Sequence, residues 1–139
     1  MPVEIFGIVA SVALGLLHVV LASQSASLQR GYKWSASARD REVPPLHGVA
    51  GRLSRASANY LESYPYFAVL ALAVYVSGSG SLVSAWGIWL YLAGRCMYLP
   101  LYAFGVYLVR SLAWNVATLG IGALGWSLVA HFWVTSSAQ

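Results

Sequence analysis

The chain has 139 residues, of which 59% are hydrophobic and only 9% are charged. A soluble domain usually carries about a quarter of its residues as charged side chains, so this composition excludes an ordinary soluble protein and indicates an integral membrane protein. The formal net charge is +4, but the basic residues lie in one loop and inside apolar segments rather than in a basic stripe, which argues against nucleic-acid binding.

Four apolar segments follow one another along the chain, at about residues 5–28, 49–76, 82–107 and 111–134. Each is near or above the ~20 residues that a helix needs to cross the hydrocarbon core of a bilayer. The alternating segments of about ten residues that are typical of membrane β-barrels are not seen. The sequence therefore predicts an all-α integral membrane fold, a four-transmembrane-helix bundle in which residues 1–139 form a single domain.

The charges of the connections predict the orientation of the bundle. Loop 29–48 carries four basic residues against two acidic ones, and Arg110 lies in the last connection, whereas the turn at 77–81 is uncharged. The positive-inside rule then places loop 29–48 in the cytoplasm and both termini on the outer side.

Small residues predict where helices approach closely. Gly7, Ser11 and Gly15 recur every four residues in the first segment, and such a face allows close packing either within a bundle or at a seam between subunits. We expect Gly122 and Gly125 to act in the same way in the last segment.

The second segment contains a polar face in an apolar setting. Arg55, Asn59 and Glu62 are spaced i, i+4 and i+7, which places all three side chains on one face of a helix. Ionised groups inside a bilayer cost roughly 2.5 to 3.5 kcal/mol each on insertion scales and are typical of functional sites.

A matching polar face lies on the third segment. Arg95, Tyr98 and Tyr102 are spaced i, i+3 and i+7, and a rise of about 1.5 Å per residue puts Arg95 and Glu62 at nearly equal depth. We expect these two to form an ion pair, since either charge buried alone would be far costlier. Such a pair could serve only to lock the two helices together.

Cations outnumber acids around these faces. Four arginines (Arg52, Arg55, Arg95 and Arg110) accompany one carboxylate, that of Glu62. The excess predicts an anionic partner that enters from the cytoplasm, because guanidinium groups bind carboxylates in bidentate pairs, while Glu62 and Asn59 could take an ammonium or an amide. Glutathione, a small zwitterion with a surplus carboxylate, is one such molecule, although the charge pattern does not single it out.

At these residues the chain resembles the family of membrane-associated proteins in eicosanoid and glutathione metabolism (MAPEG). The resemblance rests on Arg55-x3-Asn59-x2-Glu62 followed by Tyr64-Pro65, on Arg95-x2-Tyr98-x3-Tyr102, and on Arg110-Ser111. It implies a homotrimer that binds glutathione as a co-substrate at subunit interfaces near the cytoplasmic side. The small size and short turns resemble a bacterial member, which would lie in the inner membrane.

The resemblance also implies roles for individual residues. Glutathione would be held by Arg55, Asn59, Glu62, Arg95, Tyr98 and Tyr102, with Arg52 at the mouth and Arg30 from the first segment. Arg110 would stabilise the thiolate, with Ser111 as an alternative hydrogen-bond donor. Tyr107 and Trp114 would line the path of a lipophilic electrophile or lipid hydroperoxide that arrives from the bilayer. Ala58 and Ser63 depart from the family pattern and put an eicosanoid substrate in doubt.

The function expected from these features is that of a glutathione transferase or peroxidase. A non-enzymatic lipid-binding or scaffold protein on the same fold is the alternative. A small multidrug transporter ranks lower, because such proteins typically place a carboxylate within the first helix and here Glu4 lies at its tip. No metal is expected, because the three histidines lack ligand spacing, and the single cysteine, Cys96, excludes an intrachain disulfide.

Overall fold

The computed structural model describes residues 1–137, which are all-helical and contain no strand. Five helices occur: α1 (Val3–Arg30), α2 (Tyr32–Ser35), α3 (Gly48–Val76), α4 (Leu82–Phe104) and α5 (Tyr107–Ser136). The helix count is therefore five rather than four, because a single helical turn, α2, forms inside the segment that was expected to be a loop.

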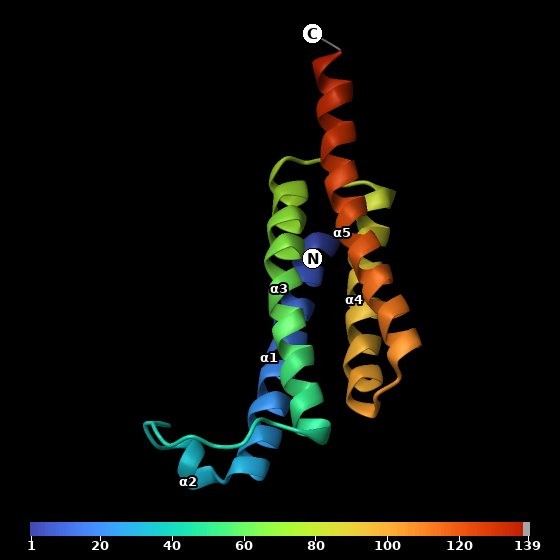
Figure 1. The fold of residues 1–139 in the computed structure, drawn as a ribbon. Coiled ribbons are helices and arrows are strands. Elements are labelled where there is room, and N and C mark those ends of the chain that lie inside the picture. The colour runs from blue at the N-terminus through green and yellow to red at the C-terminus, as the bar shows by residue number, and fades with distance from the viewer. Residues whose placement is uncertain (138–139) are drawn as a thin grey trace.

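The four long helices run up and down in chain order, so that α1 lies beside α3 and α4 lies beside α5 (Figure 1). Helix α3 also contacts α4 and α5, whereas α1 and α5 have no Cα atoms within 8 Å of each other in the described part of the chain. The last part of α5 extends beyond the ends of the other helices (Figure 1). Because α3 is the shared neighbour, its polar face is brought against both α4 and α5.

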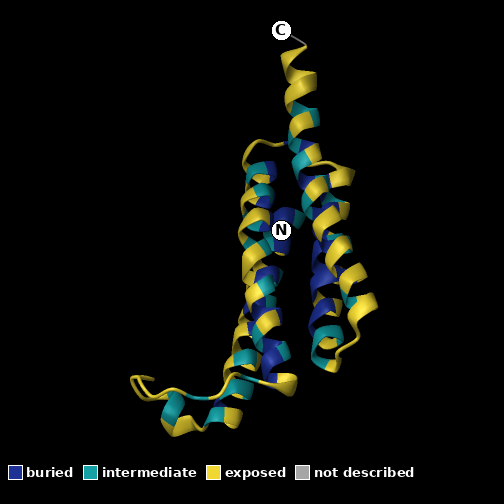
Figure 2. Ribbon diagram, in the orientation of Figure 1, coloured by how far each residue is buried: buried dark blue, intermediate teal, exposed yellow. Residues whose placement is uncertain are grey.

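Two of the helices of residues 1–137, α1 and α5, combine the length and the apolar composition of a membrane-crossing helix. Few of their residues are buried in the isolated chain, and the buried residues form stripes that face the neighbouring helices (Figure 2). This pattern is the one a bundle in lipid requires, since apolar side chains can face the hydrocarbon directly. Crossings by α3 and α4 stay a prediction.

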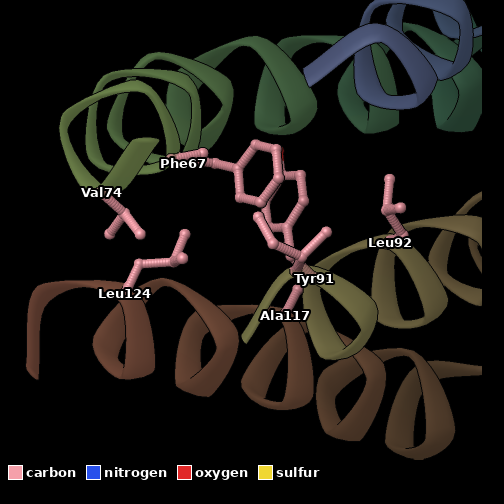
Figure 3. Close-up of a cluster of buried hydrophobic side chains, with 8 residues drawn as sticks. Phe67, Val74, Tyr91, Leu92, Ala117 and Leu124 are labelled. Carbon is pink, nitrogen blue, oxygen red and sulfur yellow. The ribbon is translucent and has the colours of Figure 1, made fainter. Parts of the chain in front are cut away.

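The core between α3, α4 and α5 is aromatic and aliphatic. The rings of Phe67 on α3 and Tyr91 on α4 are stacked with 3.8 Å between their centroids and 7° between their planes. Val74, Ala117 and Leu124 extend this cluster along the three helices (Figure 3). The cluster fixes α4 and α5 against α3 on the side of the 77–81 turn.

Glycines allow the closest helix contacts. Gly7 and Gly15 of α1 face Ile88 and Tyr60 respectively, so this small-residue face packs within the bundle. Between α4 and α5 the close contacts are made at Gly87, Gly94 and Gly120, where an added Cβ would meet backbone atoms of the facing helix. Within residues 1–137, nothing lies within 4 Å of a Cβ at Gly122 or Gly125, so the expectation of close packing there was wrong for contacts inside one subunit. A seam between subunits at these glycines stays a prediction.

The connection between α4 and α5 is shorter than the sequence pattern predicted. Gly105 has φ 78° and ψ 22°, a left-handed conformation that costs little for glycine and ends many helices. Helix α4 therefore ends at Phe104, and α5 begins at Tyr107. As a result, Arg110 lies in the first turn of α5 instead of in the connection, and Ser111 follows it inside the helix instead of opening it.

Candidate functional site

A pocket of about 260 Å³ lies where the start of α5 meets α3 and α4. We call it the Arg110 pocket. Its lining residues come from α3 (Asn59), from α4 (Tyr98) and from the first turns of α5 (Arg110, Ser111, Trp114 and Asn115). Five of these six were expected at the site from the sequence. Three successive helices therefore bring their polar residues to one place.

Arg110 adds charge at a point that is already positive. It lies in the first turn of α5, and no side chain caps that helix. The free backbone N–H groups at the start of a helix carry a partial positive charge. The guanidinium beside them adds to this charge, so the two together favour the binding of an anion.

Aromatic side chains fix the position of Arg110. Its guanidinium carbon lies 4.4 Å from the ring centroid of Tyr102, a distance at which a cation is attracted to the ring face. The Tyr102 ring in turn lies 5.3 Å from the ring of Tyr98. The two tyrosines of α4 thus form a platform under Arg110, and Tyr98 is the one that also lines the pocket.

The hydroxyl of Ser111 already donates a hydrogen bond within its own helix. It donates a hydrogen bond to the backbone carbonyl oxygen of Tyr107, at 3.0 Å. A hydroxyl has one proton to donate, so in this arrangement Ser111 offers only acceptor capacity to a ligand. Asn115 likewise donates to the carbonyl oxygen of Ser111, at 3.0 Å. Arg110 is therefore the stronger donor from α5.

Arg95 does not pair with Glu62, and the expected ion pair was wrong. Nη1 of Arg95 donates to Oδ1 of Asn59 at 2.8 Å, and Nη2 donates to the hydroxyl of Ser63. The reason is geometric: Asn59 and Ser63 are one turn apart on the face of α3 toward α4, while Glu62 lies about 60° around the helix from Asn59. Glu62 is exposed and turned toward α5.

An aromatic cage replaces the missing carboxylate around Arg95. The side chain is 0% exposed, and its guanidinium carbon lies 5.4, 5.8 and 5.9 Å from the ring centroids of Tyr98, Tyr91 and Tyr60. Each ring face attracts the cation, and two neutral oxygens accept hydrogen bonds from it. A permanently charged side chain is thus held inside the bundle without an acid from residues 1–137.

A second cavity continues the first along α3 and α5. It measures about 300 Å³ and we call it the Tyr66 pocket. Most of the atoms that face this cavity are apolar, although its lining residues include polar ones; they are Asn59, Glu62, Ser63, Tyr66, Trp114, Thr118 and Ile121. Asn59 and Trp114 belong to both pockets. The groove therefore has a polar end at Arg110 and a more apolar end at Tyr66, with one acid, Glu62, in the latter.

The remaining expected residues lie outside these two pockets. Arg52 donates from Nε to the backbone carbonyl oxygen of Ala103, at 2.9 Å, which ties the start of α3 to the end of α4. Arg30 lies over the ring of Trp34, with 4.9 Å from its guanidinium carbon to the centroid. Arg55 is exposed at the same end of the bundle, and Tyr107 is 68% exposed.

Several lining residues were not anticipated from the sequence, namely Ser63, Tyr66, Asn115, Thr118 and Ile121. Helical spacing could have found two of them. Ser63 follows Asn59 by four residues and Asn115 follows Ser111 by four, and side chains at i and i+4 share a face. The others required knowing which face of α5 meets α3.

Comparison with known families gives one match, in which the sequence profile of the MAPEG family covers residues 7–130. This range includes most of all four long helices and every residue that lines the two pockets. No curated protein matches the chain.

Proposed function

The chain belongs to the MAPEG family, a membrane-embedded family that includes glutathione transferases and related enzymes, and from this premise we propose that it is a glutathione transferase or peroxidase whose site is the Arg110 pocket. The observation that carries the proposal is the convergence of Asn59, Tyr98 and Arg110 on one pocket whose charged group is a cation. Glutathione brings two carboxylates and one ammonium to such a site.

Arg110 would supply the main chemical effect. A free thiol has a pKa near 8.5, and its thiolate is the nucleophile. A guanidinium beside the sulfur favours the charged form and lowers that pKa, with each unit worth about 1.4 kcal/mol. The hydrogen bond from Ser111 to Tyr107 supports Arg110 over Ser111 in this role. Tyr102 would keep the guanidinium in place through its ring.

The acceptor would occupy the Tyr66 pocket. In the transferase reaction the thiolate sulfur attacks an electrophilic carbon, a carbon–sulfur bond forms, and the leaving group departs with its electron pair. With a lipid hydroperoxide the thiolate attacks the distal oxygen, so that an S–O bond forms while the O–O bond breaks and the departing alkoxide takes a proton to give the alcohol. The resulting glutathione sulfenic acid would then react with a second glutathione to give glutathione disulfide and water. Trp114, which is 39% exposed and common to both pockets, supports a lipophilic acceptor beside the thiolate.

Glutathione would be oriented by the opposite charges along the groove. Its carboxylates would turn to Arg110 and, at the mouth, to Arg55 and Arg52, while its ammonium would turn to Glu62. Tyr98 would add a hydrogen bond, and Arg95 would contribute from behind Asn59. Arg30 and Tyr107 lie outside the pocket of one subunit, and would reach glutathione or the acceptor only across an interface of the proposed homotrimer.

The placement of charge supports the proposed orientation in a bacterial inner membrane. Arg30 ends α1, Arg52 and Arg55 lie near the start of α3, and Arg110 lies near the start of α5. These helix ends lie toward loop 29–48 (Figure 1). By the positive-inside rule that end would be cytoplasmic, the side on which glutathione is available, and both termini would be outside.

A lipid-binding or scaffold role is the second candidate. An apolar groove of about 260 Å³ between α1 and α3 favours it, with Val12, Leu16, Val19 and Leu61 among its lining residues. Such a groove suits an acyl chain, and a protein with that role alone would not need to bind glutathione.

Purified protein in detergent should bind glutathione and conjugate it to a chlorinated nitroaromatic. Arg110→Ala should lower kcat by at least about tenfold, because the thiol then loses a nearby positive charge, and should move the pH profile of kcat to higher pH. Arg41→Ala, an exposed loop arginine of the same charge, is the matched control and should leave both unchanged. Wild-type protein that binds no glutathione would exclude the proposed function and favour the lipid-binding role.

A further inference from the structure

We infer that Arg95 is a positioning residue: it holds the side chain of Asn59 so that the amide presents its two N–H donors to the Arg110 pocket. The ligand must then offer an acceptor oxygen, a carboxylate or a peptide carbonyl, at this point. The inference rests on the proposed function and adds to it a residue that acts without touching the ligand.

The orientation of Asn59 follows from the chemistry of its partner. A guanidinium carries five N–H donors and no acceptor, so the group of Asn59 that faces Arg95 must be its amide oxygen. Nη1 of Arg95 and Oδ1 of Asn59 are 2.8 Å apart. Nδ2 is the other end of the same planar amide, and Asn59 lines both pockets.

The alternative orientation is strongly disfavoured. A flipped amide would set its N–H groups against those of a permanent cation and leave a buried donor without an acceptor. Arg95 cannot easily move to accommodate the flip, since it is 0% exposed and is held by Ser63 and by the rings of Tyr60, Tyr91 and Tyr98.

The hydrogen bonds of the two amides show which donors remain for a ligand. Within residues 1–137, no protein acceptor binds the Asn59 Nδ2 donors, whereas the other amide of the pocket, Asn115, donates to the backbone. Arg95 itself lines neither pocket. Its effect on a ligand is therefore exerted through Asn59, and the family-based expectation of direct contact between Arg95 and glutathione is replaced by an indirect one.

Two substitutions of Asn59 test the role of its amide oxygen and the role of its amide N–H groups separately. Asn59→Asp keeps an oxygen for Arg95 but replaces both donors with an acceptor, while Asn59→Leu removes both ends at similar size. Gln24→Glu adds the same negative charge on exposed α1 and retains the oxygen that accepts from Tyr32, so it controls for net charge. Thermal stability is measured without ligand, and glutathione binding is measured by calorimetry.

Asn59→Asp should unfold at or above the wild-type temperature, because a carboxylate accepts from a guanidinium at least as well as an amide does, while Asn59→Leu should unfold several degrees lower. Glutathione affinity should fall at least tenfold in Asn59→Asp and stay unchanged in Gln24→Glu. If Asn59 had a purely structural role, a variant that is as stable as wild type would also bind glutathione as well as wild type.

A variant of Arg95 gives an independent readout. Arg95→Gln retains a neutral donor for Asn59 but no longer excludes the flipped amide, so it should raise KM for glutathione and leave the pH profile of kcat, which Arg110 sets, unchanged.

The inference is overturned if Asn59→Asp binds glutathione as tightly as wild type or more tightly, since Asn59 would then accept from the ligand. It is also overturned if Asn59→Asp is as unstable as Asn59→Leu. If wild-type protein binds no glutathione, both the proposed function and this inference are excluded. If wild type binds glutathione and Asn59→Asp binds it as tightly, only the inference is excluded.

Discussion

Gly94 on α4 is a position at which one added methyl group should have a large structural effect. A Cβ there would lie 2.7 Å from the carbonyl oxygen of Ala113 and 2.8 Å from the backbone nitrogen of Ala117. Both atoms belong to the backbone of α5 and cannot rotate away. Reaching the 3.4 Å of ordinary contact requires α4 and α5 to separate by roughly 0.7 Å locally, and overpacking of this kind costs about 1–3 kcal/mol.

Alanine also improves the helix, so the net effect of Gly94→Ala is smaller than the clash. The gain in helix propensity is about 0.8–1 kcal/mol, which leaves a net destabilisation of up to about 2 kcal/mol. Gly122→Ala on α5 is the matched control, because it has the same gain and nothing within 4 Å of the new methyl group. That variant should be stabilised by up to about 1 kcal/mol.

The difference between the two variants isolates the clash. At roughly 4 °C per kcal/mol for a chain of this size, Gly94→Ala should unfold about 4–12 °C below Gly122→Ala when both are heated in the same detergent and followed by tryptophan fluorescence. Gly94→Ala should also bind glutathione less well, since Ala113 lies within one turn of Arg110 and Trp114. Equal unfolding temperatures for the two variants would refute the close approach of α4 and α5 at this point.

Three further substitutions test the geometry around the start of α5. Ser111→Ala should retain at least half of wild-type kcat in the conjugation assay, because the wild-type hydroxyl already donates its hydrogen bond to the Tyr107 carbonyl oxygen. A loss comparable to that of Arg110→Ala would make Ser111 the hydrogen-bond donor to the thiolate instead. Tyr102→Phe should keep kcat, while Tyr102→Leu should lower it several-fold by removing the ring beneath Arg110, and equal losses would point to the hydroxyl. Gly105→Ala should lower the free energy of unfolding by about 1–2 kcal/mol, because its φ of 78° is strained for a side chain that has a Cβ; a denaturant titration that shows no loss would contradict this reasoning.

The sequence predicted the four long helices because their signal is strong and local. Apolar runs of about 20 residues or more admit few other structures, and the start of α4 at Leu82 agrees with the expected position. The ends near Gly105 could not be placed as well, since the residues on both sides of it are equally apolar. Only the left-handed conformation of Gly105 decides where α4 stops.

The site was predicted less completely, because spacing defines a face of one helix but not the neighbour that the face meets. Arg55, Asn59 and Glu62 were expected to face α4 together. In the structure the face of α3 toward α4 passes through Asn59 and Ser63, while Glu62 is turned toward α5. Equal depth along the helix axes does not fix the rotation of a side chain about its axis, and for this reason the expected partner of Arg95 was wrong.

The partner of Arg95 decides how much charge is left for a ligand. An ion pair with Glu62 would have consumed the only acid of the groove and left a site that could bind anions alone. Because tyrosine rings and neutral oxygens surround Arg95 instead, Glu62 stays exposed in the Tyr66 pocket. Asn59 and Glu62 are about 4.5 Å apart along the axis of α3, so the groove offers donors and a cation toward one end and a carboxylate close by. A fatty acid would bind the donors and the cation but would leave the Glu62 carboxylate without a partner. A zwitterionic peptide would bind both, and this is the strongest physical reason to prefer glutathione over a simple anionic lipid in this groove.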